Sequence, residues 1–199
     1  CRIEATSGRS HARSPCHDGG LSVDFRCQMA MKEVGPKGQA KLGDSCVVVV
    51  GLGGLGGMAA ELLARSGVGQ LILVDFDTVA DSNLHRQLLF TPADIGRTKA
   101  EVAGDKLSSF GSTITVFQGR IKELEIPSFD LLVDATDQIS ARLACNRIAL
   151  GRGRPLVSGG AEGWEGWVAN FGKSACFECA FGRPQVSTTC ELTGILGPV

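Results

Sequence analysis

The sequence predicts an α/β fold in which a mainly parallel sheet carries helices on both faces. Short apolar segments alternate with segments of helical periodicity, and a glycine-rich turn joins the first such strand to the first such helix. With 199 residues, of which 43% are hydrophobic, the chain is long enough for one well-buried domain and too short for two large ones. We therefore expect a single core.

The elements follow from where these patterns start and stop. Residues 1–24 are rich in Arg, Ser, Gly and His without a period, which predicts a loose leader before one domain over 25–199. In residues 28–42 helical character is interrupted at Gly35-Pro36, so we expect two short helices. The apolar runs predict strands at 46–50, 70–75, 113–117, 130–135 and 155–158, and the intervening patterns predict helices at 54–66, 98–109 and 139–150.

Beyond these elements the pattern changes. Residues 161–171 alternate and contain glycine and tryptophan, which predicts short antiparallel strands after the parallel part. Trp164 and Trp167 lie in this segment, and we favour a packing role for both over a partner-binding face.

The glycine-rich turn has the spacing of a dinucleotide-binding fingerprint. Gly51, Gly53 and Gly56 follow the first strand and open the first helix, and the acid Asp75 follows about twenty residues later. Unpaired backbone N–H groups and the helix dipole favour an anion at such a turn. The pattern predicts a Rossmann-like nucleotide fold, although a tight packing turn would give the same glycines.

The charge and composition of the chain exclude several classes of partner and location. The formal charge is −1, the pI is near 6.3 and no basic block occurs, so neither nucleic acid nor anionic lipid is an expected partner. No apolar stretch approaches the roughly 20 residues of a membrane span, and the N-terminus lacks the apolar core of a secretion signal. Cys46 and Cys145 fall in apolar patterns rather than in a disulfide framework. These features predict a cytoplasmic protein.

Two cations and an acid follow the strands of the predicted sheet. Arg86 and Lys99 lie in the segment after the second strand, and Asp137 lies at the end of a later strand. A site that splits a triphosphate needs cations aimed at the phosphates and an acid for magnesium, and these residues can supply both. Taken singly, an arginine in a loop or a lysine at a helix terminus is usually a solvated surface residue. Asp77 and Asp134 are weaker candidates, and Asp134 could instead pair with Arg142.

Five motifs, in this order and spacing, resemble the ThiF/MoeB/HesA family, which is related to the ubiquitin-activating enzymes. The motifs are Gly51-Leu-Gly-Gly-Leu-Gly56, Asp75-Phe-Asp77, Ser82-Asn-Leu-His-Arg-Gln87, Gly96-Arg-Thr-Lys99 and Ala135-Thr-Asp137. The resemblance covers roughly residues 28–199.

The resemblance implies an adenylyltransferase. In that family the C-terminal glycine carboxylate of a ubiquitin-like sulfur carrier ending in Gly-Gly attacks the α-phosphate of Mg-ATP and releases pyrophosphate, as in molybdopterin or thiamine biosynthesis. By motif position, Gly54 lies against the nucleotide together with Gly51, Gly53 and Gly56, and Asp75 binds the ribose. The resemblance implies that Asn83, Arg86 and Lys99 contact the phosphates and that Asp137 binds the magnesium ion. It also implies a homodimer.

Cys176 and Cys179 have the C-x-x-C spacing of one half of a tetrahedral zinc site. In the resembling family the other two ligands come from a second C-x-x-C nearer the C-terminus, which this sequence does not contain. The chain begins with Cys1 and stops at Gly197-Pro-Val199, so we expect a fragment that lacks the C-terminal part. Loss of the metal is the alternative.

Cys190 matches the position at which some family members carry a thiol that accepts the activated carrier or its sulfur. A loop cysteine without chemistry explains the sequence equally well.

The sequence departs from the family in two further places. Members commonly show Arg-x-x-Arg-Gln before the first helix, and the second arginine reaches the phosphates of the neighbouring subunit. Here the run is Asp24-Phe-Arg-Cys-Gln28, in which Arg26, one position off, could partly substitute for that arginine. Gln138 stands where asparagine is usual.

Two other functions remain open from the sequence. A nicotinamide-dependent oxidoreductase would use the same glycine fingerprint, but it would not need Arg86 and Lys99. An inactive nucleotide-binding or carrier-docking module would explain the departures from the family pattern.

Overall fold

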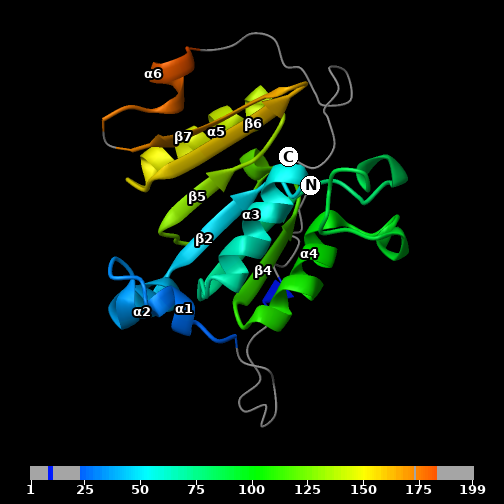
Figure 1. Ribbon diagram of the computed structural model, residues 1–199. Coiled ribbons are helices and arrows are strands. Elements are labelled where there is room, and N and C mark those ends of the chain that lie inside the picture. The colour runs from blue at the N-terminus through cyan, green and yellow to red at the C-terminus, as the bar shows by residue number, and fades with distance from the viewer. Residues whose placement is uncertain (1–8, 11–22, 173, 183–199) are drawn as a thin grey trace.

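In the computed structural model, which describes residues 9–10, 23–172 and 174–182, one sheet runs through the molecule (Figure 1). Its strands stand in the order β1-β4-β3-β2-β5-β6-β7. β4, β3, β2, β5 and β6 pair in parallel, whereas β1 and β7 are antiparallel to their neighbours at the two edges. The strands are β1 (Arg9–Ser10), β2 (Cys46–Val50), β3 (Gln70–Asp75), β4 (Thr113–Gln118), β5 (Leu131–Asp134), β6 (Leu156–Glu162) and β7 (Glu165–Phe171).

Helices cover both faces of this sheet. The α-helices are α1 (Arg26–Met29), α2 (Gly35–Asp44), α3 (Gly54–Arg65), α4 (Lys99–Leu107), α5 (Ile139–Gly151) and α6 (Phe177–Phe181). Short 3-10 turns lie at Asp81–Asn83, Pro92–Asp94, Ser108–Phe110 and Ile121–Glu123. The prediction of a mainly parallel sheet with helices on both faces is confirmed.

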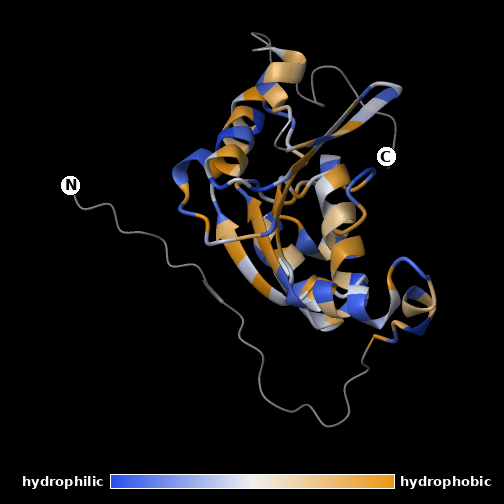
Figure 2. Ribbon diagram, turned by 90° about the vertical axis from the view of Figure 1, so that its left-hand side faces the viewer, coloured by the Kyte–Doolittle hydropathy of each residue, from blue (hydrophilic) through white to orange (hydrophobic). Residues whose placement is uncertain are grey.

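Alternate residues of the central strands pack into two separate apolar cores, one on each face of the sheet. Val47 and Val49 of β2 pack with α3 and α4 on one face, whereas Val48 and Val50 pack with α5 on the other. Period-two alternation along a strand sends successive side chains to opposite faces, so a strand that is buried on both must be apolar throughout. Figure 2 shows the central strands mostly in orange between helices of mixed colour.

The strand order fixes where a ligand can bind. The chain runs outward from β2 through β3 to β4, and then returns to place β5 on the other side of β2. The loops after β2 and β5 therefore leave in opposite directions, and the resulting crevice at the carboxyl ends is the usual ligand site of such sheets.

The elements differ from the prediction mainly at their ends. The interruption at Gly35-Pro36 is the start of α2, because proline is tolerated in the first turn, where its missing N–H is not needed. β6 continues four residues beyond the predicted strand, since it pairs with β7 up to Glu162. Arg9–Ser10 forms a short strand on β4, which the sequence analysis did not anticipate.

The packing role expected of the two tryptophans is wrong for Trp164. Trp164 is 88% exposed and lies in the turn between β6 and β7. Trp167 is 38% exposed, and its ring lies 5.1 Å from that of Phe181 and 6.2 Å from that of Phe177. Only Trp167 therefore contributes to packing.

Among the helices that the structure describes, none is both long enough and apolar enough to cross a membrane.

Candidate functional site

The turn after β2 is built so that only glycine fits at two of its positions. Gly51 has φ +83°, and a Cβ on it would lie 2.9 Å from the carbonyl oxygen of Ala135. A Cβ on Gly56 would lie 1.7 Å from the carbonyl oxygen of Gly51, so α3 could not approach the turn. Gly53 caps α3 and Gly54 begins it. The result is a helix N-terminus without side chains in front of its N–H groups, which suits a phosphate.

Asp75, at the end of β3, ties this turn to the neighbouring strand. Its Oδ2 accepts a hydrogen bond from the N–H of Leu52 at 2.6 Å, and its Oδ1 accepts one from the N–H of Asp77 at 2.8 Å. Burial raises the pKa of the Asp75 carboxyl, and these two bonds oppose that rise. An ionised carboxylate offers about four lone-pair sites, so two more acceptor positions remain for a ligand hydroxyl.

The segment after β3 carries Asn83 and Arg86. Asn83 is buried, and its Oδ1 accepts a hydrogen bond from the N–H of Ala80 at 3.2 Å, which fixes the turn. Arg86 is half-buried and donates from Nη1 to the carbonyl oxygen of Ser82 at 3.0 Å. A guanidinium has five N–H donors, so this bond leaves others for an anion.

Lys99 is not the surface lysine that its sequence context allows. It is the first residue of α4, whose N-cap Thr98 accepts a hydrogen bond from the N–H of Glu101 at 3.3 Å. Lys99 is 5% exposed, and its Nζ lies 3.1 Å from Oδ2 of Asp77. A buried ammonium needs such a partner, so Asp77 fixes where Lys99 points.

The loop after β5 separates two acids with different surroundings. Asp134 is buried and pairs with Arg142 at 3.4 Å, as the sequence allowed, and it also accepts a 2.5 Å hydrogen bond from Ser158. Asp137, three residues later, is exposed at the pocket. Asp134 is thus a structural acid, and Asp137 is the one that a ligand can reach.

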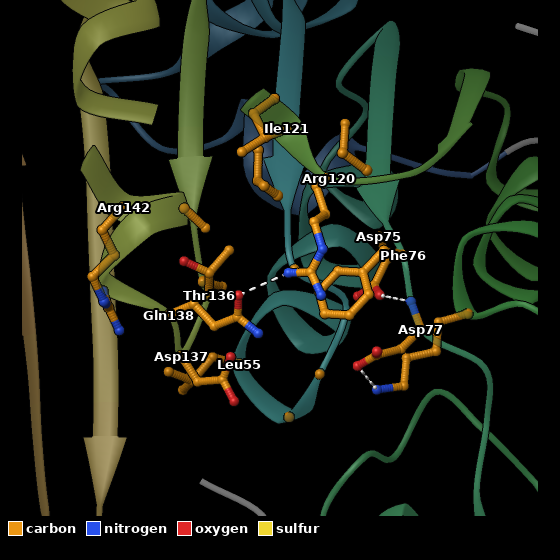
Figure 3. Close-up of a pocket in the computed structure, with 18 of the residues that line it drawn as sticks. Leu55, Asp75, Phe76, Asp77, Arg120, Ile121, Thr136, Asp137, Gln138 and Arg142 are labelled. Atoms are coloured by element: carbon orange, nitrogen blue, oxygen red, sulfur yellow. Dashed lines mark hydrogen bonds and ion pairs between the residues drawn. The ribbon is translucent and has the colours of Figure 1, made fainter. Parts of the chain in front are cut away.

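One pocket of about 450 Å³ brings these residues together (Figure 3). This volume falls within the range of ligand pockets in general. The predicted residues that line it are Gly51, Gly53, Gly54, Asp75, Asn83, Arg86, Lys99 and Asp137. Gly56 does not line it but lies beneath the turn as a packing glycine.

The pocket also contains residues that were not predicted from the sequence to contact the ligand. Phe76, Arg120 and Arg142 line it. Phe76 lies within the Asp75-Phe-Asp77 motif, whereas nothing local in the sequence distinguishes Arg120 and Arg142 from surface residues. Gln87 also lines it, and its Oε1 is a buried atom without a hydrogen-bond partner in the described part of the chain. Gln87 closes one of the five motifs, so its position in the sequence was a usable signal.

Cys176 and Cys179 lie away from this pocket, around the start of α6. Their sulfurs are 3.2 Å apart, and hydrogen bonds from the Cys179 side chain and backbone lower the pKa of Cys176. Within the described residues no cluster of three or more His, Cys, Asp or Glu could hold a metal ion. The zinc half site therefore stays a prediction. Cys190 lies outside the described residues.

Within the part of the chain that the structure describes, the Arg26 side chain makes a local contact. Its Nε lies 2.6 Å from Oδ2 of Asp24, at the start of α1, and it is not among the residues that line the pocket. A contribution to the site of a neighbouring subunit stays a prediction.

Comparison with known proteins agrees with the motifs. The ThiF family model matches residues 25–199. The chain is 36% identical over 183 residues to a protein of Dictyostelium discoideum named adenylyltransferase and sulfurtransferase MOCS3, covering 86% of this chain and 43% of that protein. It is 37% identical over 189 residues to the sulfur carrier protein adenylyltransferase of Thermus thermophilus, covering 87% of this chain and 70% of that protein. The chain thus spans less than half of the MOCS3 protein.

A solved structure with the same fold contains ATP. This structure, of the E. coli tRNA N6-threonylcarbamoyladenosine dehydratase TcdA in complex with ATP, matches with a TM-score of 0.64 and 29% identity over 70% of this chain and 60% of that one. The structure of E. coli MccB with succinimide matches with a TM-score of 0.67 and 27% identity over 72% of this chain and 45% of that one. The sequence match over residues 25–199 and the shared fold together show that the chain belongs to the ThiF family.

Proposed function

We propose that the protein adenylates the C-terminal glycine of a ubiquitin-like sulfur-carrier protein with ATP and releases pyrophosphate. The observation that supports this most is that Arg86, Lys99 and Asp137, which come from three different segments, line one pocket with the glycine turn. A hydride-transferring enzyme would not need two cations and an exposed acid beside that turn. The names of the two curated relatives support the choice of a sulfur carrier as the substrate.

The pocket suggests how ATP would bind. The triphosphate would lie against the N-terminus of α3 at Gly53 and Gly54, with Asp75 toward the ribose. Arg86 and Lys99 would neutralise the phosphate oxygens. Magnesium keeps several waters and needs only one or two protein carboxylates beside phosphate oxygens, so the exposed Asp137 fits it.

The reaction would join an oxygen of the carrier's terminal carboxylate to the α-phosphorus. The bond between the α-phosphorus and the bridging oxygen breaks, and the electron pair leaves with pyrophosphate. Negative charge grows on the leaving group and on the α-phosphate oxygens, where Arg86 and Lys99 would stabilise it. Magnesium, when bound, would neutralise charge on the phosphates. The carboxylate is already ionised at neutral pH, so the step needs no general base.

Pyrophosphate exchange into ATP tests this function with the whole natural protein. We expect exchange that requires both magnesium and a carrier with an intact Gly-Gly end. Arg86→Ala and Lys99→Ala should each lower kcat/KM by about 100-fold or more. Arg97→Ala is the matched control, since Arg97 is exposed, pairs with Asp105 at 2.6 Å and does not line the pocket. Absence of exchange with a competent carrier would remove the proposal.

A homodimer and a zinc ion held by Cys176 and Cys179 are further parts of the proposal. The two sulfurs are 3.2 Å apart and would have to separate to the roughly 3.8 Å of a tetrahedral site with Zn–S bonds of about 2.3 Å, and two ligands would have to come from elsewhere. Sedimentation and metal analysis of the whole natural protein test these two features separately.

A further inference from the structure

Arg120 holds two other residues of the pocket together. Its guanidinium lies 4.0 Å from the centre of the Phe76 ring, and its Nη1 donates a 2.9 Å hydrogen bond to Oε1 of Gln138. Figure 3 shows Arg120 between the ring of Phe76 and the amide of Gln138. We call these three residues the Arg120 clasp.

The clasp connects loops that are far apart in the sheet. Arg120 follows β4, Phe76 follows β3, and Gln138 follows β5. β4 and β5 are separated by β3 and β2, which corresponds to about 14 Å at the usual strand spacing. The Arg120–Gln138 bond therefore passes across the carboxyl ends of β2 and β3, where Gly51 and Asp75 lie.

The clasp leaves room for a ligand. Phe76, Arg120 and Gln138 all line the pocket of about 450 Å³. The clasp is thus part of the pocket wall, and the space beside it remains large enough for a ligand of ordinary size.

The clasp lies at the nucleoside side of the expected ligand. Phe76 is the residue next to Asp75, the acid expected at the ribose, whereas Arg86 and Lys99 lie on the segments that follow. Arginine planes stack on bases as well as on aromatic rings, and Phe76 already holds the guanidinium by one such contact. Arg120 is therefore suited to cover a base and ribose rather than to neutralise phosphates.

We propose that Arg120, held by Phe76 and Gln138, closes over the nucleoside part of bound ATP and retains it in the pocket. This inference depends on the nucleotide binding in the proposed function, but not on the transfer of AMP. In this account Arg120 contacts the nucleoside, and Phe76 and Gln138 are positioning residues that hold Arg120. The glutamine at position 138 has one methylene more than asparagine, and its amide oxygen reaches Arg120.

Calorimetric titration with two ligands tests the clasp. The ligands are the α,β-methylene analogue of ATP, which cannot transfer AMP, and inorganic tripolyphosphate, which has no nucleoside. Arg120→Ala should raise the Kd for the analogue about tenfold and change the Kd for tripolyphosphate less than about twofold. Arg120→Lys should resemble Arg120→Ala, because lysine keeps the charge but has no planar fork.

Two further variants test whether Arg120 and Gln138 act as a unit. Gln138→Ala should weaken binding of the analogue, and the double variant should bind no worse than Arg120→Ala alone, since the two residues share one bond. Arg154→Ala is the matched control. Arg154 does not line the pocket, its side chain is 46% exposed and it pairs with Asp130 at 3.4 Å, so a change below about twofold is expected.

Each outcome bears on the clasp. Tighter binding by Arg120→Ala would mean that Arg120 blocks the pocket, and equal weakening for both ligands would mean a damaged fold; either result overturns the proposal. A wild-type protein that binds neither ligand removes both the clasp and the proposed function. If Arg120→Ala weakens binding of the ATP analogue alone and the wild type shows no pyrophosphate exchange, the clasp stands and adenylation is removed. If the variants bind both ligands like the wild type and exchange is normal, adenylation stands and the clasp is removed.

Discussion

Nζ of Lys99 lies 3.1 Å from Oδ2 of Asp77, and the lysine side chain is 6% exposed while that of Asp77 is 46% exposed. The two residues are 22 positions apart, and the backbone N–H of Lys99 also donates to the carbonyl oxygen of Asp77 at 3.0 Å. Lys99 is therefore held at the pocket before any ligand binds. Asp77, which holds it, is half-exposed, so it can be substituted without leaving a cavity in an apolar core.

Asp77→Asn tests this arrangement. The amide cannot neutralise the ammonium, so Lys99 loses its fixed direction, and we expect kcat/KM in pyrophosphate exchange to fall about tenfold. Thermal unfolding should also show a loss of about 1–3 kcal/mol, because the buried ammonium of Lys99 loses its charged partner, although the half-exposed Asp77 leaves no cavity. A more active Asp77→Asn variant would instead mean that Asp77 competes with the phosphates for Lys99.

Two glycines of the same turn should respond differently to alanine. Gly56→Ala would place a Cβ 1.7 Å from a backbone oxygen, so α3 must move and we expect a loss of several kcal/mol in the free energy of unfolding. Gly54→Ala would place one 3.3 Å from the carbonyl oxygen of Arg86, which a small shift relieves, but the methyl group would stand in the pocket.

Urea unfolding and ATP binding separate these two effects. We expect Gly54→Ala to fold and to bind ATP at least tenfold more weakly. Gly43→Ala in α2 is the control, since its Cβ would meet nothing within 4 Å and alanine favours a helix by about 0.5–1 kcal/mol. Equal stability of the Gly54→Ala and Gly56→Ala variants would contradict the close approach of α3 to the turn.

Removing one partner of the buried ion pair of Asp134 and Arg142 should strongly lower the free energy of unfolding. Both side chains are less than a tenth exposed, and Arg142 also donates to the carbonyl oxygen of Gly159 at 2.8 Å, which joins α5 to β6. Asp134→Ala leaves the guanidinium unpaired, so we expect a loss of about 3–5 kcal/mol in urea unfolding. Glu123→Ala breaks the exposed pair with Lys122 and should cost less than about 1 kcal/mol. Similar costs for the two variants would contradict this account.

Asp94 should make stability depend on pH in acid. A hydrogen bond from Lys106 lowers the pKa of Asp94 to about 2, and bonds from Thr91 contribute. A folded pKa below the ordinary 3.8 means that the ionised form stabilises the fold, fully above about pH 5, and that this stabilisation is lost as pH falls from about 4 to about 2. Because Lys106 is one-third exposed, we expect about 1–2 kcal/mol.

Wild type and Asp94→Asn should therefore differ in urea unfolding at pH 6 and converge near pH 2. A difference that stays constant across this range would assign the effect to packing rather than to charge.

The sequence predicts the sheet because its strands are buried on both faces. Such strands must be apolar throughout, and Val47–Val50 satisfy this without knowledge of their neighbours. The glycine turn is predictable for a similar reason, since the spacing of Gly51 and Gly56 reflects a local clash. Both features depend on interactions that lie within or next to one segment.

The features that could not be predicted depend on contacts between residues far apart in the sequence. Arg120 and Gln138 meet only because β4 and β5 lie in one sheet, three strand positions apart. Gln138 departs from the family pattern, but nothing in its own segment indicates that Arg120 is its partner. The exposure of Trp164 follows from the position of the β6–β7 hairpin at an edge of the sheet, which the alternating pattern does not reveal. Lys99 could be placed near the site from its motif, but its burial against Asp77 could not.

The destination of the α-phosphate tests the central claim most directly. The whole natural protein would be incubated with the carrier, magnesium and ATP labelled either at the α-phosphate or at the γ-phosphate. We predict that the α-label moves to the carrier, only when its terminal glycine is present, and that the γ-label appears in pyrophosphate. Transfer of the γ-label to the carrier, or no transfer of the α-label to a competent carrier, would contradict the claim.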